Sequence, residues 1–375
     1  MRTRNISPVE ERPPICLIGI IYRAWRMILF GFSILSAGRS RFAKLFSPMV
    51  DLVDETYQDG DSEYALRIHQ PKRIQKPLPA VILYHGATPH GEKHETMNML
   101  AVNLARMGMR VYLPELPLLK QALVREETIP RMKLVYSLIT SRKEVRKDRI
   151  LLAGVSFAGG LALKAGADPE INPTAIMCYG SYYDLESALR YFLTGRARFG
   201  EITVNVRPHD YARAVLFWNY LDQMELDLDM HRLRECMYLF ITDEHDKAWA
   251  LAGSFGEGEQ SFANMAFDPD DESGMHVAEQ ILPKIRNQLQ SISPKYFIDQ
   301  IASPVFLVHG IQDIMIPYTE TLALAKDFEL AKKEHYVYIS RIYGHATPEK
   351  RSTREFLREM RDLVTFLNRL FKYLL

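Results

Sequence analysis

The chain has 375 residues, of which 47% are hydrophobic, and a formal net charge of +1. It has no basic patch or stripe of the kind that nucleic-acid binding requires, so no nucleic-acid partner is expected. Its three cysteines, Cys16, Cys178 and Cys236, are far apart and odd in number. They form no disulfide framework, which indicates a reducing compartment such as the cytoplasm.

The sequence predicts an apolar and basic helical segment over residues 1–45. No residue from Ile15 to Ala37 is acidic, and Arg23 and Arg26 interrupt the apolar run. A bilayer span takes roughly 20 residues, and an arginine near the bilayer centre costs about 2.5–3.5 kcal/mol. Three alternatives stay open for residues 13–38. They are a helix packed on the domain or lying peripherally on a membrane, a transmembrane anchor, or a flap over the active site.

Residues 46–180 alternate between strand and helix patterns. The strands 53–57 and 64–69 flank Asp59-Gly60-Asp61, which is a hairpin signal. Pro79–Tyr84 is a continuous apolar run, typical of a strand buried on both faces. Further strands are expected at 109–113, 149–152 and 175–179, and helices at 97–107, 130–141 and 159–167. This alternation predicts βαβ units and a mostly parallel central sheet flanked by helices, an α/β fold.

The alternation stops over residues 181–293, which have a mostly helical pattern and many aromatic residues. It resumes with strands at 304–310 and 336–339 and ends in an amphipathic helix over 356–371. The sequence therefore predicts one α/β core, made of residues 46–180 and 294–375, with a helical cap inserted at 181–293.

The run Gly154-Val155-Ser156-Phe157-Ala158 ends a strand pattern and opens a helix pattern. This is the pattern of a nucleophile elbow, in which a serine occupies a strained strand-to-helix turn. Small residues are needed around the serine because the backbone passes close on both sides, and Gly154 and Ala158 meet this need. The common motif has glycine where this chain has Ala158, so the match is to a variant.

A serine hydroxyl becomes a good nucleophile when a base takes its proton. His345 follows the strand at 336–339, and Asp313 lies in the loop after the strand at 304–310. Ser156, Asp313 and His345 all come at the carboxyl ends of strands, where open α/β sheets bind ligands. Asp184, which follows the strand at 175–179, is an alternative acid.

Three motifs taken together resemble the α/β-hydrolase superfamily: the elbow, His309-Gly310-x-x-Asp313-x-x-Ile316-Pro317, and Gly344-His345. The resemblance is to the serine-nucleophile branch, near dienelactone-hydrolase-like and prolyl-oligopeptidase-like enzymes. It covers roughly residues 50–180 and 295–375. Dienelactone hydrolases use a cysteine nucleophile, so Ser156 does not imply their activity.

The resemblance implies a role for each residue. Ser156 would be the nucleophile, His345 the general base and then acid, and Asp313 the group that orients the imidazole. The backbone N–H groups of Phe157 and Ala87 would form the oxyanion hole. The structural support is expected from His85 and Gly86 in the oxyanion loop, from Gly154 and Ala158 at the elbow, and from His309 at its strand end.

No metal or cofactor is expected. The histidines at positions 90, 94, 209, 245 and 276 show no ligand spacing, and the chain has neither a P-loop nor a Gly-x-Gly-x-x-Gly motif. Glu115 is expected to be a loop carboxylate without a catalytic task.

The expected function is that of a serine hydrolase of the carboxylesterase type, which cleaves an ester or thioester of a small-molecule acyl substrate with an apolar part. A peptidase or amidase of the same fold is one alternative. Its relatives usually carry an N-terminal propeller, and only about 50 residues precede the first strand here. A non-catalytic, membrane-associated scaffold is another alternative, against which an intact Ser, Asp and His set argues.

Overall fold

The computed structural model of the protein describes residues 30, 48–72, 76–224, 227–267, 273–344 and 353–375. An eight-stranded sheet runs through the core in the order β1-β2-β4-β3-β5-β6-β9-β10. The strands are β1 (Val50–Asp59), β2 (Ser62–Pro71), β3 (Leu78–Tyr84), β4 (Arg110–Pro114), β5 (Val145–Val155), β6 (Ala175–Tyr179), β9 (Val305–Gln312) and β10 (His335–Gly344). β1 pairs with β2 and β2 with β4 in antiparallel fashion, and every other pair in the sheet is parallel. The mostly parallel sheet expected from the sequence is confirmed.

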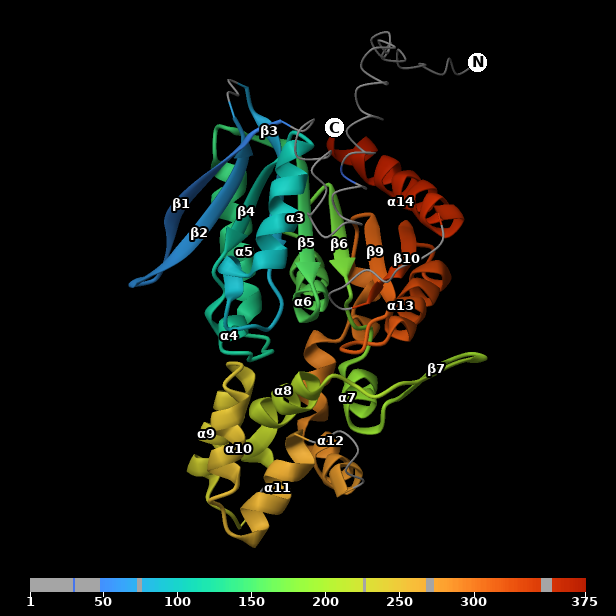
Figure 1. Ribbon diagram of the computed structural model, residues 1–375. Helices are drawn as coiled ribbons and strands as arrows, with labels where there is room; N and C mark the ends of the chain where they lie inside the picture. The colour runs from blue at the N-terminus through green and yellow to red at the C-terminus, as the bar shows by residue number, and fades with distance from the viewer. Residues whose placement is uncertain (1–29, 31–47, 73–75, 225–226, 268–272, 345–352) are drawn as a thin grey trace, which may run out of the picture.

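Helices cover both faces of the sheet (Figure 1). They are α3 (Glu95–Arg106), α4 (Pro117–Lys120), α5 (Thr128–Ser141), α6 (Phe157–Gly166), α13 (Tyr318–Leu330) and α14 (Thr353–Leu374). Buried side chains of α3 and α14 belong to one hydrophobic cluster on one face of the sheet, and those of α5, α6 and α13 belong to the larger cluster on the other. β3 is buried at every residue because both of its faces are covered.

The insertion lies between β6 and β9, two strands that pair directly with each other. It contains α7 (Leu185–Thr194), α8 (Asp210–Tyr220), α9 (Met230–Ile241), α10 (His245–Ala252), α11 (Glu257–Phe267) and α12 (Ser273–Ile292). α8 to α11 lie beyond the carboxyl ends of the sheet strands (Figure 1). The mostly helical cap is therefore at the end of the sheet where Ser156 lies.

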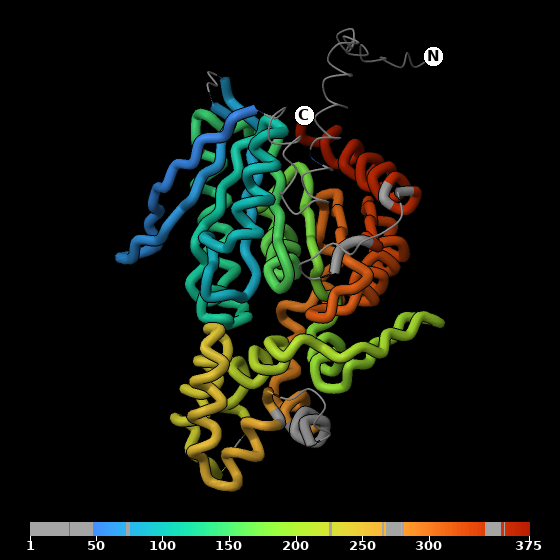
Figure 2. Tube along the Cα trace, in the orientation of Figure 1, coloured from blue at the N-terminus to red at the C-terminus, as the bar shows by residue number. Residues whose placement is uncertain are grey.

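The insertion also contains a hairpin of β7 (Arg196–Phe199) and β8 (Ile202–Asn205), which the sequence reading did not predict. It extends away from the body of the molecule (Figure 2). Each strand is only four residues long and many of the side chains are exposed, so the hairpin gives a weak strand signal within a mostly helical pattern.

Phe30 is the one described residue of the N-terminal segment. It is buried, and its ring meets Phe371 of α14 edge-on, with the ring centroids 6.2 Å apart. In the ranges that the structure describes, no helix combines the length and apolar character that crossing a bilayer requires.

Candidate active site

Ser156 occupies a strained backbone position between β5 and α6. Its φ is 55° and its ψ is −130°, a conformation that a residue with a side chain rarely adopts. The N–H of Ser156 donates to the carbonyl oxygen of Tyr179 on the neighbouring strand, 2.7 Å away. Strain of this kind persists only where the surrounding structure enforces it, and it concentrates at functional sites.

Close backbone packing enforces this turn. A Cβ on Gly154 would collide with the carbonyl group of Ala158 and come within 2.6 Å of the amide nitrogen of Gly159. A Cβ on Gly159 would in turn lie 2.6 Å from the side chain of Ser181. Ala158 itself is fully buried, so the elbow accepts one methyl group where the common motif has glycine.

The loop after β3 comes up against the nucleophile. A Cβ on Gly86 would lie 3.2 Å from the Cβ of Ser156 and 3.8 Å from its hydroxyl oxygen. No oxygen of a described residue accepts a hydrogen bond from the N–H of Ala87, the next residue, or from that of Phe157. An oxyanion hole needs two backbone donors of this kind near the nucleophilic oxygen.

His85 holds this loop from inside the protein. Its Nδ1 lies 2.8 Å from the carbonyl oxygen of Gly86, and its Nε2 accepts from the N–H of Leu116, 3.2 Å away. Since a carbonyl can only accept, Nδ1 carries the proton and the imidazole is neutral. Complete burial lowers the pKa of His85 to about 4, which keeps this form at neutral pH.

Asp313 lies buried just after β9. Its Oδ1 accepts from the N–H of Met315 at 2.8 Å and from that of Ile316 at 3.1 Å, which fixes the orientation of the carboxyl group. The chain comes close on the other side as well, because a Cβ on Gly180 would lie 3.2 Å from Oδ2. Gly180 directly follows Tyr179, the residue of β6 that accepts from the N–H of Ser156. The ends of β6 and β9 therefore bring the Asp313 loop close to the turn that carries Ser156.

His309 supports the Asp313 loop. It is fully buried, and its Nε2 lies 2.8 Å from the carbonyl oxygen of Ile316, to which it donates. Its Nδ1 lies 2.7 Å from the hydroxyl of Thr321. Since Nε2 holds the proton, Nδ1 accepts from that hydroxyl. His309, in the strand before the acid, is therefore bonded to Ile316 just after Asp313 and to Thr321 of α13.

His345 lies outside the described residues. The residue before it, Gly344, pairs with Gln312, which is the residue before Asp313. The strands that lead to the expected base and to the expected acid thus end side by side.

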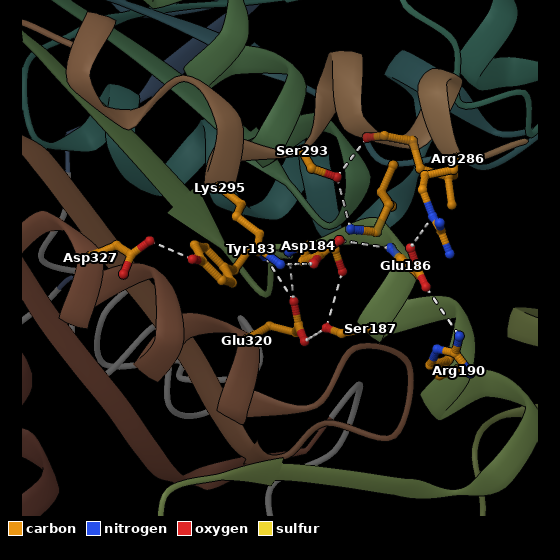
Figure 3. Close-up of polar contacts among 12 residues, drawn as sticks. Tyr183, Asp184, Glu186, Ser187, Arg190, Arg286, Ser293, Lys295, Glu320 and Asp327 are labelled. Atoms are coloured by element: carbon orange, nitrogen blue, oxygen red, sulfur yellow. Dashed lines mark hydrogen bonds and ion pairs between the residues drawn. The ribbon is translucent and has the colours of Figure 1, made fainter. Parts of the chain in front are cut away.

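Asp184, the alternative acid, is occupied at the start of α7. Its Oδ1 accepts from the N–H of Glu186 as the helix N-cap, and its Oδ2 pairs with Lys295 at 2.8 Å. Figure 3 shows this arrangement, in which both carboxylate oxygens have partners. An N-cap role is an ordinary structural use of aspartate.

Glu320 is a buried carboxylate that the sequence did not single out. One of its oxygens accepts from the N–H groups of Tyr183 and Asp184, each at 3.0 Å, and the other accepts from the Ser187 hydroxyl (Figure 3). Burial raises the pKa of Glu320. At the third position of α13 it reads as an ordinary exposed helix-start glutamate, so only the structure reveals that it holds the strand-to-cap connection.

Glu115 takes part in surface ion pairing rather than in the site. It pairs with Lys120 at 2.9 Å and accepts from the N–H of Ala65 at 3.1 Å. Among the described residues, no group of three or more His, Cys, Asp or Glu side chains is placed to hold a metal ion.

Comparison with known proteins gives a likeness in structure only. No family model and no curated protein matches the sequence. Two structures of the acylaminoacyl peptidase of Pyrococcus horikoshii match with TM-scores of 0.53 and 0.51, at 11% and 13% identity over 88% and 89% of this chain. A puromycin-hydrolyzing peptidase of Mycobacterium tuberculosis matches with a TM-score of 0.50 at 14% identity over 87% of this chain.

The chain spans 43% of the length of the Pyrococcus enzyme and 40% of that of the mycobacterial one. At such low identity the likeness concerns the fold alone. It confirms the fold expected from the sequence.

Proposed function

Because the chain has the α/β-hydrolase fold, we propose that it is a serine hydrolase that cleaves an ester or thioester through an acyl-enzyme on Ser156. Asp313 and His345 complete the triad in this proposal. The observation that carries it is the strained turn at Ser156 beside two backbone N–H groups, those of Ala87 and Phe157, that have no acceptor among the described residues.

Each residue then has a defined task. The Ser156 hydroxyl attacks the carbonyl carbon while His345 takes its proton, and Asp313 stabilises the charged imidazole. The N–H groups of Ala87 and Phe157 bind the negative oxygen of the tetrahedral intermediate. When this collapses, the bond to the leaving alcohol or thiol breaks and His345 returns the proton to it. A water molecule, activated by the same imidazole, then releases the acid and regenerates Ser156.

An apolar part in the substrate is supported by the many aromatic residues of the insertion, whose helices α8 to α11 lie beyond the carboxyl ends of the sheet strands. The overall net charge of +1 gives no bias toward a strongly charged substrate. Ester and thioester cleavage use the same machinery, so the fold does not separate them.

A fluorophosphonate probe tests the proposal directly. It should label the purified wild-type protein. In a separate assay, the unlabelled protein should release p-nitrophenol from p-nitrophenyl butyrate. Ser156→Ala should abolish both, with kcat lower by roughly 10⁴–10⁶-fold and with an unchanged circular dichroism spectrum. A folded wild-type protein that reacts with neither reagent would support the non-catalytic scaffold instead.

A peptidase is the second candidate, because the similar structures reported above, with TM-scores of 0.50 to 0.53, are named as peptidases. The comparison of an ester with a matched amide decides between the two. If N-acyl-phenylalanine p-nitroanilide is turned over as efficiently as the corresponding p-nitrophenyl ester, the peptidase is favoured. If only the ester is cleaved, the esterase is favoured.

For Phe30, the one described residue of the segment 13–38, we propose a role in the core rather than in membrane binding. The buried contact of Phe30 with Phe371 supports this choice. Sedimentation with liposomes of phosphatidylcholine and phosphatidylserine tests it. The full-length protein should stay in the supernatant, as should a shorter protein that begins at Ser40. Sedimentation of the full-length protein alone would instead establish peripheral membrane association.

A further inference from the structure

The beginning of α8 joins two loops of the candidate site. The backbone N–H of His209, the N-cap of this helix, donates to the carbonyl oxygen of Ile314 at 3.0 Å. The hydroxyl of Tyr211 donates to the carbonyl oxygen of Ala87, also at 3.0 Å. Ile314 directly follows Asp313, and Ala87 directly follows Gly86. One turn of a cap helix therefore touches both the acid loop and the oxyanion loop.

The hydrogen bond from Tyr211 to Ala87 fixes the peptide group between Ala87 and Thr88. The N–H of Thr88 donates to the carbonyl oxygen of Leu119 at 2.9 Å, and the carbonyl oxygen of Ala87 accepts from Tyr211. Both polar groups of the Ala87–Thr88 peptide are thus bonded, the N–H to the core and the carbonyl to the cap.

The preceding peptide is the one that presents a donor next to Ser156. Its carbonyl oxygen, on Gly86, accepts from His85, while its N–H, on Ala87, has no acceptor among the described residues. Because the next peptide is held at both ends, rotation about the Ala87 backbone is restricted. The direction of the Ala87 N–H is therefore set by His85 on one side and by Tyr211 on the other.

The hydroxyl of Tyr211 can act only as a donor in this contact, because a carbonyl oxygen has no proton to give. Burial raises the pKa of Tyr211, so the proton is present throughout the neutral range. The contact is therefore a constant feature of the site rather than a switch.

We propose that Tyr211 is a positioning residue for the acyl-transfer reaction, which aims the Ala87 N–H at the oxyanion from the cap. This inference rests on the proposed function. It predicts that Tyr211→Phe lowers kcat by roughly 10–100-fold, because small displacements of a preorganised donor are costly. The KM should change less than about threefold, because the contact is not made to the substrate.

Trp218→Phe is the matched control. Trp218 lies on the same helix, and its indole N–H donates to the carbonyl oxygen of Gln121 at 2.7 Å. This is also a hydrogen bond from the cap to the core, but its acceptor is not in the oxyanion loop. Loss of cap docking in general would affect both variants alike, whereas a loss of oxyanion positioning would affect Tyr211→Phe alone.

The experiment measures kcat and KM with p-nitrophenyl butyrate for the wild type and both variants, normalised to the fraction of protein that a fluorophosphonate titrates to completion. It also measures inhibition by an alkyl trifluoromethyl ketone, which forms a tetrahedral adduct on the serine, and by the corresponding unreactive alcohol. Tyr211→Phe should weaken the ketone by about the same factor as kcat and leave the alcohol unchanged. Trp218→Phe should leave all four values close to those of the wild type.

The outcomes distinguish a failure of the positioning role of Tyr211 from a failure of the proposed function. An active wild type in which Tyr211→Phe matches Trp218→Phe, or in which ketone and alcohol weaken equally, overturns the positioning role alone. A folded wild type that neither hydrolyses the ester nor reacts with the phosphonate overturns the proposed function and this inference with it.

Discussion

The hydroxyl of Tyr182 donates to the carbonyl oxygen of Ile292 at 3.0 Å, so the two ends of the insertion meet although 110 positions separate them. The contact is reinforced by Ser293, whose hydroxyl accepts from the N–H of Leu185 at 3.0 Å and donates to the carbonyl oxygen of Leu289 at 2.6 Å. All of these groups are buried. The first and last residues of the insertion are therefore joined to each other by buried hydrogen bonds, and we call this contact the junction.

Ser293→Ala should destabilise this junction. It leaves the buried N–H of Leu185 without an acceptor, which costs about 1–3 kcal/mol of unfolding free energy. Urea unfolding measures this loss, and limited proteolysis should show faster cleavage in the insertion. Ser291→Ala removes a hydroxyl that bonds only within its own helix, and it should cost less than about 0.5 kcal/mol. Equal effects of the two substitutions would contradict the structural role of Ser293.

The acid of the triad can be identified by two matched substitutions. Asp313→Asn keeps an oxygen to accept from Met315 and Ile316 but removes the charge, and it should lower kcat by about 10⁴-fold. Asp184→Asn keeps a good N-cap and should leave kcat within about threefold of the wild type. Ester hydrolysis at pH 8 measures both. The reverse order of effects would make Asp184 the acid.

Gly154→Ala should distort the nucleophile elbow. The new Cβ would meet the backbone of Ala158 and Gly159, which cannot move without shifting Ser156. We expect a loss of at least about 1–3 kcal/mol in stability and a much slower reaction with the fluorophosphonate. Gly253→Ala is the control, because the nearest atom to its Cβ would lie 3.4 Å away. Normal labelling of Gly154→Ala would contradict the close backbone packing at the elbow, because it would show that a methyl group fits at position 154.

His85 should make the stability of the protein depend on pH. Its pKa is about 4 in the folded protein, against about 6.5 in an unfolded chain. Between these values the unfolded chain binds a proton that the native protein does not, so stability rises with pH and is lost as the pH falls from 6.5 to 4. The slope from this residue is at most about 1.4 kcal/mol per pH unit.

Urea unfolding of His85→Gln at a series of pH values checks this. The variant should be less stable than the wild type at pH 7, and the difference should shrink as the pH falls toward 4. Exposed His231→Gln should follow the wild-type curve. Parallel curves for wild type and His85→Gln would show that folding does not change the pKa of His85.

Phe30→Ala should destabilise the protein by about 3–5 kcal/mol, because it removes a buried ring that packs on Phe371. Leu357→Ala, at an exposed position of α14, should cost less than about 0.5 kcal/mol. Thermal unfolding without detergent or lipid measures both. An unchanged melting temperature for Phe30→Ala would indicate that this segment does not contribute to the core.

The parts of the fold that local pattern determines could be predicted from the sequence. The apolar run before Tyr84 predicted β3 because a strand covered on both faces tolerates little else, and Ser156 was found because only a strand-to-helix turn requires such small neighbours. Residues whose task depends on distant partners could not be found. Tyr211 and Ala87 are 124 positions apart, and Glu320 and Tyr183 are 137 positions apart, so no short window contains both members of either pair.

The strand order also sets a constraint on the synthesis of this protein. β6 is the direct neighbour of β9, yet the 125 residues at positions 180–304 separate them in the chain. At an elongation rate of about 5–20 residues per second, the apolar edge of β6 stays unpaired on the ribosome for on the order of ten seconds before β9 is synthesised. An unpaired apolar edge is an aggregation hazard, and parallel pairing across such a distance is slow in itself. The nascent chain should therefore depend on chaperones until β9 emerges, and the yield of soluble protein should rise when chaperones are co-expressed.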